Sequence, residues 1–166
     1  MSTHRQTQRV AVGIDGSDNS QRAVRWAIQN AHVGDTVILV HVWHPYIYGT
    51  ELATAFTIDD SVATALLEEQ FAMFLPMAKE HEITLKRVLI QGDARNSLQI
   101  PNTDLLVLGA RGHSGIIGLL LGSVADYVTR HSTVPVVVIP PEAPTSDTSS
   151  STSQTKSTEK SASIDA

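Results

Sequence analysis

The stretch Asp104-Leu-Leu-Val-Leu-Gly109-Ala-Arg-Gly112 decides the fold of this chain. Its first half is a short apolar run that ends in glycine, a pattern typical of a strand buried on both faces of a parallel sheet. Gly122-Ser123 follows at the spacing G-x2-G-x9-G-S. Glycines let backbone N–H groups approach a phosphate, and a helix that opens at Gly-Ser adds partial positive charge. The stretch therefore predicts an anion site at the end of a parallel strand.

The chain before this stretch alternates between strand and helix patterns. Residues 9–15 predict a buried strand that ends at Asp15. N-cap candidates among residues 16–20 precede a helix that reaches Asn30 and has one apolar face. Residues 36–43 are almost continuously apolar, which predicts a second strand covered on both faces.

The middle of the chain carries mixed signals. Residues 44–57 contain proline, glycine and three aromatic residues, and an irregular segment is predicted there. A long helix is expected from about Val62 to Glu80, with Pro76 kinking it or ending it early. Residues 85–91 predict the third strand.

The last elements surround the opening stretch. After a turn at Gly92 there is room only for a short helix before Pro101. Residues 105–108 form the predicted fourth strand, residues 123–131 a helix, and residues 134–139 the fifth strand. Pro135 deprives that strand of a hydrogen-bond donor, so it is expected at a sheet edge. Short strand–helix–strand connections predict a parallel sheet with right-handed crossovers.

Composition bounds the function. Hydrophobic residues make up 42% of the 166 residues, which fits a folded domain over residues 1–141. Residues 142–166 contain 13 Ser or Thr and almost no large apolar side chain, so a disordered tail is expected there. There is no cysteine, no apolar run of about 20 residues for a membrane span, and no export signal at the start. The net charge of −5 does not favour nucleic acid, and a cytoplasmic protein is expected.

Several nucleotide and catalytic motifs are absent. The chain has no Gly-Lys-Ser/Thr phosphate loop, no dinucleotide fingerprint after Gly13, and no G-x-S-x-G nucleophile motif. His41 and His44 are three residues apart on a predicted strand, which places them on opposite faces and disfavours a metal pair.

The motifs together resemble the universal stress protein family, and in particular its ATP-binding subclass. The resemblance spans residues 8–140 and rests on Val12-Gly-Ile-Asp-Gly-Ser17, His41-Val42, Gly92, the stretch from Asp104 to Gly112, and Leu121-Gly-Ser-Val-Ala125. It implies a Rossmann-like, doubly wound α/β fold with five parallel strands in the order 3-2-1-4-5 and helices on both faces. It also implies a homodimer through the last edge strand, and closing an exposed apolar edge in this way makes physical sense.

The resemblance also implies a set of ligand contacts. Val42 corresponds to the position whose backbone contacts the adenine edge. The ribose and phosphate contacts correspond to Leu108, Gly109, Ala110, Arg111, Gly112, Gly122, Ser123 and Val124. Arg111 and His113 either neutralise phosphate or are simply solvated. The Ser123 hydroxyl either donates to phosphate or acts as an N-cap.

Asp15 is expected to face the same crevice, because it ends the first strand. It holds ribose hydroxyls or Mg²⁺, or else it serves only as a turn acid for the next helix. A carboxylate beside a triphosphate is repelled unless a metal or hydroxyl intervenes.

The expected function is an ATP-binding stress-response module or slow switch with little or no hydrolysis, because phosphoryl transfer needs a placed water, a base and charge stabilisers. The alternatives are a weak Mg²⁺-dependent ATPase, a sensor of a cyclic adenine nucleotide, and a structural dimer without a ligand.

Overall fold

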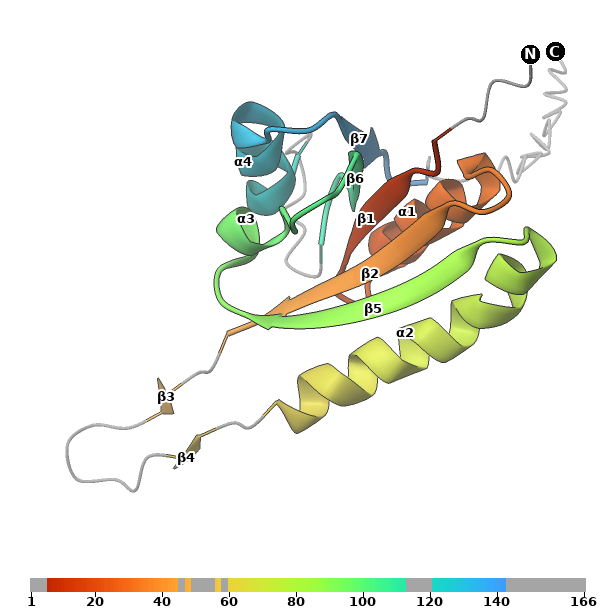
Figure 1. The fold of residues 1–166 in the computed structure, drawn as a ribbon. Helices are drawn as coiled ribbons and strands as arrows, with labels where there is room; N and C mark the ends of the chain where they lie inside the picture. The colour runs from red at the N-terminus through yellow and green to blue at the C-terminus, as the bar shows by residue number, and fades with distance from the viewer. Residues whose placement is uncertain (1–5, 45–46, 49–55, 58–59, 113–120, 143–166) are drawn as a thin grey trace, which may run out of the picture.

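A five-stranded parallel sheet forms the centre of the molecule, in the order β5-β2-β1-β6-β7. A computed structural model describes residues 6–44, 47–48, 56–57, 60–112 and 121–142 (Figure 1). The strands are β1 Arg9–Ile14, β2 Thr36–Trp43, β5 Thr84–Gln91, β6 Leu105–Gly109 and β7 Val136–Ile139. Counted along the chain, this is the expected order 3-2-1-4-5.

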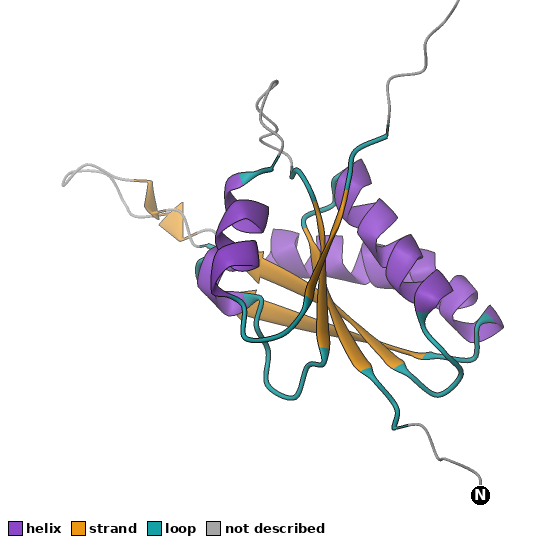
Figure 2. Ribbon diagram, turned by 90° about the horizontal axis from the view of Figure 1, so that it is seen from above, coloured by secondary structure: helices purple, strands orange, loops and turns teal. Residues whose placement is uncertain are grey.

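Helices cover both faces of the sheet (Figure 2). α1 Asp18–Asn30 and α2 Ser61–Glu80 pack on one face, and α3 Ala94–Ser97 and α4 Ser123–His131 on the other. The doubly wound, Rossmann-like architecture is thereby confirmed. α3 is a single turn, as the short segment before Pro101 predicts. Among the residues described, no helix is long and apolar enough to cross a membrane.

Successive side chains of the central strands point to opposite faces of the sheet, and both sets of side chains are apolar and buried. On β1, Val10, Val12 and Ile14 pack toward α1 and α2, whereas Ala11 packs toward α3 and α4. All four are nearly inaccessible to water. Burial on both faces explains why these strands are almost continuously apolar rather than alternating with polar residues.

The segment between β2 and α2 corrects the expectation of an irregular connection. β3 Ile47–Tyr48 pairs antiparallel with β4 Phe56–Thr57. β-branched and aromatic residues favour strands, and a two-residue antiparallel pair needs only local contacts. The irregular segment was expected because this stretch contains Pro and Gly, which commonly mark turns.

Pro76 does not end α2, which continues four residues beyond it to Glu80. Proline removes the donor that would bond the carbonyl of Ala72. Both residues lie on the exposed side of the helix, where water can bond that carbonyl. The buried stripe continues past this point with Phe74 and Ala78. The prediction of early termination was therefore wrong.

The last strand begins at Val136, two residues later than predicted. The hydroxyl of Ser132 accepts from the N–H of Val134 and donates to its carbonyl, so a local turn occupies that residue. Pro135 precedes the strand, and its carbonyl accepts from the N–H of Leu106 at 3.0 Å. The edge position of β7 is confirmed.

Candidate functional site

The predicted site residues gather where the strand order reverses. β1 and β6 are neighbours in the middle of the sheet, and their connections leave in opposite directions. Asp15 follows β1, and the loop from Gly109 to Gly112 follows β6. Open α/β sheets bind ligands in the crevice beyond the carboxyl ends of such strands. Residues 113–120, which include the candidate His113, lie outside the part of the chain that the structure describes.

Asp15 joins the two loops of this crevice. Its Oδ1 accepts from the backbone N–H of Ser17 at 3.0 Å and from the Ser17 hydroxyl at 2.6 Å. Gly16 between them has φ +82°, a conformation that favours glycine. The other oxygen, Oδ2, lies where a Cβ on Gly112 would stand. Asp15 therefore is a turn acid, as one of its two expected roles required, and its carboxylate also lies against the second loop glycine.

Ser17 is the N-cap of α1, because its side chain accepts from the N–H of Ser20 at 3.3 Å. The hydroxyl of Ser17 thus bonds Asp15 on one side and the helix on the other. Side chains of the protein itself therefore occupy the start of α1.

Gly109 is required by the packing of α1 on β6. A Cβ at this position would lie 2.8 Å from the carbonyl carbon of Asn19 and 2.9 Å from its oxygen. These atoms belong to the backbone of the first helical turn, which cannot move aside alone. The first glycine of the motif thus has a structural reason independent of any ligand.

The two halves of the glycine motif meet through hydrogen bonds. The N–H of Gly122 donates to the carbonyl of Ala110 at 2.7 Å, and the N–H of Ala110 donates to Ile139 in β7 at 2.8 Å. The start of α4 is therefore held against the loop after β6, across residues that the structure does not describe.

Gly122 differs from Gly109 because the protein does not need a glycine there. Its φ of −71° and ψ of 162° suit any residue, and within the described part of the chain the atom nearest to a Cβ is the Ala110 oxygen at 3.5 Å. Gly122 is the N-cap of α4, with no side-chain cap bond. Ser123 is the exposed first residue of the helix, so the alternative in which Ser123 is the N-cap is wrong.

The remaining contacts that the family resemblance implies are backbone contacts. The side chains of Leu108 and Val124 pack into the core beneath α3 and α4, and Val42 packs against the same cluster. β2 extends past its last partner in β1, since His41 pairs with Ile14 and Val42 pairs only with β5. The ring of His41 donates from Nδ1 to the carbonyl of Ile14 at 2.8 Å. Val42 therefore reaches the crevice beyond the end of β1.

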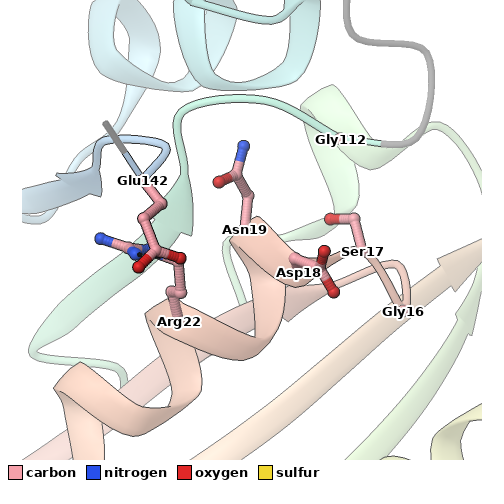
Figure 3. Close-up of a pocket in the computed structure, with 7 residues that line it drawn as sticks. All are labelled: Gly16, Ser17, Asp18, Asn19, Arg22, Gly112 and Glu142. Atoms are coloured by element: carbon pink, nitrogen blue, oxygen red, sulfur yellow. Dashed lines mark ion pairs between the residues drawn. The ribbon is translucent and has the colours of Figure 1, made fainter. Parts of the chain in front are cut away.

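A pocket of about 490 Å³ lies beside the crevice, between the first turns of α1 and the loop after β6 (Figure 3). It is lined by Gly16, Ser17, Asp18, Asn19, Arg22, Gly112 and Glu142. Apart from Gly112, the sequence argument assigned none of these to the site. The spacing of Asp18 and Arg22 places them on one side of a helix, but nothing in the sequence places Glu142 beside them.

A separate charged pair lies at the end of β5. The carboxylate of Asp93 accepts from the backbone N–H of Arg95 and from its guanidinium, and it caps α3. The hydrogen bond from the Arg95 side chain, then the one from its backbone, lowers the pKa of Asp93 from 3.8 to about 2. Both groups are exposed, so the pair contributes little to stability.

The donor set excludes a metal site built from protein ligands alone in the described part of the chain. No group of three or more His, Asp or Glu side chains there can hold an ion. Mg²⁺ commonly uses one or two carboxylates together with the phosphates of a substrate. Asp15 beside the loop glycines fits that arrangement.

Comparison with known proteins identifies the class of this fold and site. The model of the universal stress protein family matches residues 6–140, and the chain belongs to this family. It is 28% identical over 162 residues to universal stress protein Rv1996 of Mycobacterium tuberculosis, covering 86% of this chain and 51% of that protein. The chain thus spans about half the length of the curated relatives it matches.

Solved structures share the fold. A universal stress protein in complex with cAMP is 29% identical, with a TM-score of 0.56, and the match covers 82% of this chain and 98% of that one. The hypothetical protein MJ0577 has a TM-score of 0.61 at 18% identity, and the match covers 84% of this chain and 99% of that one. The latter shows the shared fold.

Proposed function

We propose that this protein binds an adenine nucleotide, with ATP as its ligand, and acts as a stress-response binding module or slow switch with little or no hydrolysis. The start of α4 carries the proposal. It opens at a glycine with no side-chain cap, and among the described residues the atom nearest to a Cβ on Gly122 would be the Ala110 oxygen at 3.5 Å. Helix N-termini of this kind leave backbone N–H groups for an anion.

The base and ribose are assigned to the other side of the crevice. Val42 supplies backbone groups beyond the end of β1, and Leu108, Ala110 and Val124 supply backbone groups around the loop. The side chains of Leu108 and Val124 are packed in the core. Substitutions at these two positions should therefore lower the stability of the fold and do not isolate an effect on nucleotide binding.

Asp15 is assigned to Mg²⁺ or to a ribose hydroxyl. Its carboxylate lies at Gly112, between β1 and the phosphate loop. The repulsion between the Asp15 carboxylate and a phosphate is relieved when a divalent cation lies between the two groups, and the cation neutralises phosphate charge when bound. Arg111, in the same loop, is a further neutralising group.

A direct test is calorimetric titration with ATP, with adenosine as a phosphate-free reference. Gly122→Val puts a branched side chain into the phosphate space, so ATP binding should fall by at least about 100-fold. Adenosine binding should be retained, and circular dichroism should show an intact fold. Gly122→Ala should give an intermediate loss. ATP binding that survives Gly122→Val would refute the phosphate assignment.

Whether the protein hydrolyses ATP is tested by measuring phosphate release. Phosphate release by the purified protein should stay at contaminant level in the wild type and in Asp15→Ala. A rate that collapses on Asp15→Ala would instead establish the weak Mg²⁺-dependent ATPase.

A cyclic adenine nucleotide is the second candidate ligand, because a structural relative at 29% identity is described in complex with cAMP. Mass spectrometry of nucleotide released from protein purified without added ligand separates the two. Recovered ATP supports the first proposal, and recovered cAMP replaces it with the second.

We also propose that β7 pairs with β7 of a second copy. It is a sheet edge whose outer backbone groups have no neighbouring strand in the described chain. A charge there, Val137→Lys, should convert a dimer to a monomer in light scattering. Val62→Lys, at a valine that is 70% exposed on α2, is the control. An unchanged dimer in Val137→Lys would locate the interface elsewhere.

A further inference from the structure

The pocket beside α1 contains one cation that the nucleotide proposal does not use. Arg22 lies in the second turn of α1 and points into the pocket (Figure 3). Within the described chain, its side chain makes one polar contact, between Nη1 and the Glu142 carboxylate at 3.5 Å. That distance is longer than a normal hydrogen bond. Its buried Nε meets no acceptor there. A guanidinium presents five N–H donors, so Arg22 can donate to a further acceptor besides Glu142.

Glu142 is held loosely. Its side chain is 81% exposed, whereas that of Arg22 is 34% exposed. Ion pairs with such exposure are weak and screened by salt. The Glu142 carboxylate is therefore easily displaced from Arg22.

The charges of the lining oppose an anion while Glu142 is in place. Asp18 and Glu142 contribute two carboxylates against the single guanidinium of Arg22. When the Glu142 carboxylate moves away from Arg22, the pocket loses a negative charge and the guanidinium becomes available to another acceptor. A phosphate that replaces Glu142 meets less repulsion, and it can accept two parallel hydrogen bonds from the guanidinium.

Gly112 connects this pocket to the start of α4. It lines the pocket, and its backbone nitrogen lies 3.8 Å from where a Cβ on Gly122 would stand. A phosphate chain anchored at Gly122 that continues past Gly112 therefore enters the space before Arg22. A monophosphate anchored at the same place does not extend that far.

We propose that Arg22 binds the outer phosphates of a nucleoside triphosphate, and that the Glu142 carboxylate occupies this guanidinium when the site is empty. This inference rests on the proposed nucleotide site and adds its selectivity for phosphate-chain length. Glu142 then acts as a competitor supplied by the chain itself, directly before the Ser/Thr-rich sequence of residues 143–166.

The test measures the Kd for ATP and for AMP in the wild type, Arg22→Gln and Glu142→Gln, at the same Mg²⁺ and salt concentrations. In Arg22→Gln the Kd for ATP should rise about tenfold, the scale of losing a charge-assisted pair, and the Kd for AMP should not change. In Glu142→Gln the Kd for ATP should fall about threefold, again without effect on AMP. Raising the salt concentration should shrink the Glu142→Gln effect.

Charge-matched controls lie away from the pocket. Arg130→Gln removes an exposed cation from the end of α4, and Glu68→Gln removes an exposed carboxylate from α2. Both should leave the ATP-to-AMP ratio of the wild type unchanged.

The outcomes separate the two proposals. Equal changes for ATP and AMP in Arg22→Gln, or no change in the ratio in either variant, overturn the inference while the nucleotide site stands. A wild type that binds neither ATP nor AMP overturns the proposed function, and the inference with it. AMP binding retained in Arg22→Gln also shows that the variant is folded.

Discussion

The two ends of the glycine motif look alike in sequence and differ in structure. A Cβ on Gly109 would lie 2.8 Å from the backbone of Asn19, so the fold itself excludes a side chain there. A Cβ on Gly122 would make only ordinary contacts with the described residues, at 3.5 Å or more, and the backbone angles suit any residue, so the fold tolerates a side chain. The difference teaches that one motif carries two constraints. Its first glycine lets α1 pack on β6, whereas its last glycine is not required by packing and lies where we propose that phosphate binds.

The largest expected effect is on stability. Gly109→Ala should lower the free energy of unfolding by about 3 kcal/mol, because the added methyl group overpacks against a rigid helix turn. Gly122→Ala should cost less than about 1 kcal/mol, as expected for a poorer N-cap residue. Urea denaturation of both variants measures the contrast. Equal losses would show that the two glycines do not differ in this way.

The next effect concerns Asp15, which lies between the two ends. Asp15→Asn keeps an oxygen for the bonds from Ser17 but removes the charge. ATP binding in Mg²⁺ should weaken about tenfold, whereas binding in EDTA should not weaken. Calorimetry with and without the metal checks this, with Glu80→Gln at the far end of α2 as a charge-matched control. A metal-independent loss would assign Asp15 to the ribose.

A smaller contrast compares the serines at the two helix starts. Ser17→Ala removes the cap of α1 and the 2.6 Å bond to Asp15, so stability should fall by about 1 kcal/mol. Ser123→Ala removes no cap bond, and stability should stay within about 0.5 kcal/mol. The ATP affinity of Ser123→Ala should instead fall a few-fold. Thermal melts and titrations read the two effects separately.

The smallest expected effect concerns Asp93, which lies away from both glycines and serves as a reference for substitutions that should not change ATP binding. The pKa of Asp93 is lowered from 3.8 to about 2 by its hydrogen bonds with Arg95. The stabilising contribution of the ionised carboxylate is therefore present above pH 3.8 and is lost as the pH falls toward 2. Arg95→Gln should raise this pKa toward 3.8 without restoring it fully, because the backbone N–H of residue 95 still donates. An NMR titration of the Asp93 side chain follows the shift, and ATP affinity at neutral pH should not change.

Much of the fold was predictable because the strands are locally encoded. The apolar runs of β1, β2 and β6 are buried on both faces, which leaves little ambiguity about their type. The failures have local causes as well. Pro76 was expected to kink α2 or end it early, but it lies on the exposed side of a helix that continues to Glu80. The two-residue pair of β3 and β4 lies in a segment that was expected to be irregular because it contains Pro and Gly.

The candidate site was predictable only where its residues are close in sequence or belong to the motif. Asp15 and the loop glycines meet because β1 and β6 are adjacent, which follows from the strand order. Glu142 contacts Arg22, which lies 120 residues earlier in the sequence. Away from the site, the fully buried Asp35 likewise accepts from the N–H of Gln8 at 2.8 Å. Neither contact is marked by a periodic pattern or a motif spacing in the sequence.

The sequence by itself determined the succession of the five strands of the parallel sheet and of their helices, and the position of a glycine loop after β6. These follow from periodicity and turn chemistry, which act over a few residues. Only the tertiary structure decided that Gly109 serves packing while Gly122 does not, and that Arg22 lies beside Glu142. Those distinctions depend on which atoms distant segments bring into contact, and no local pattern records such distances.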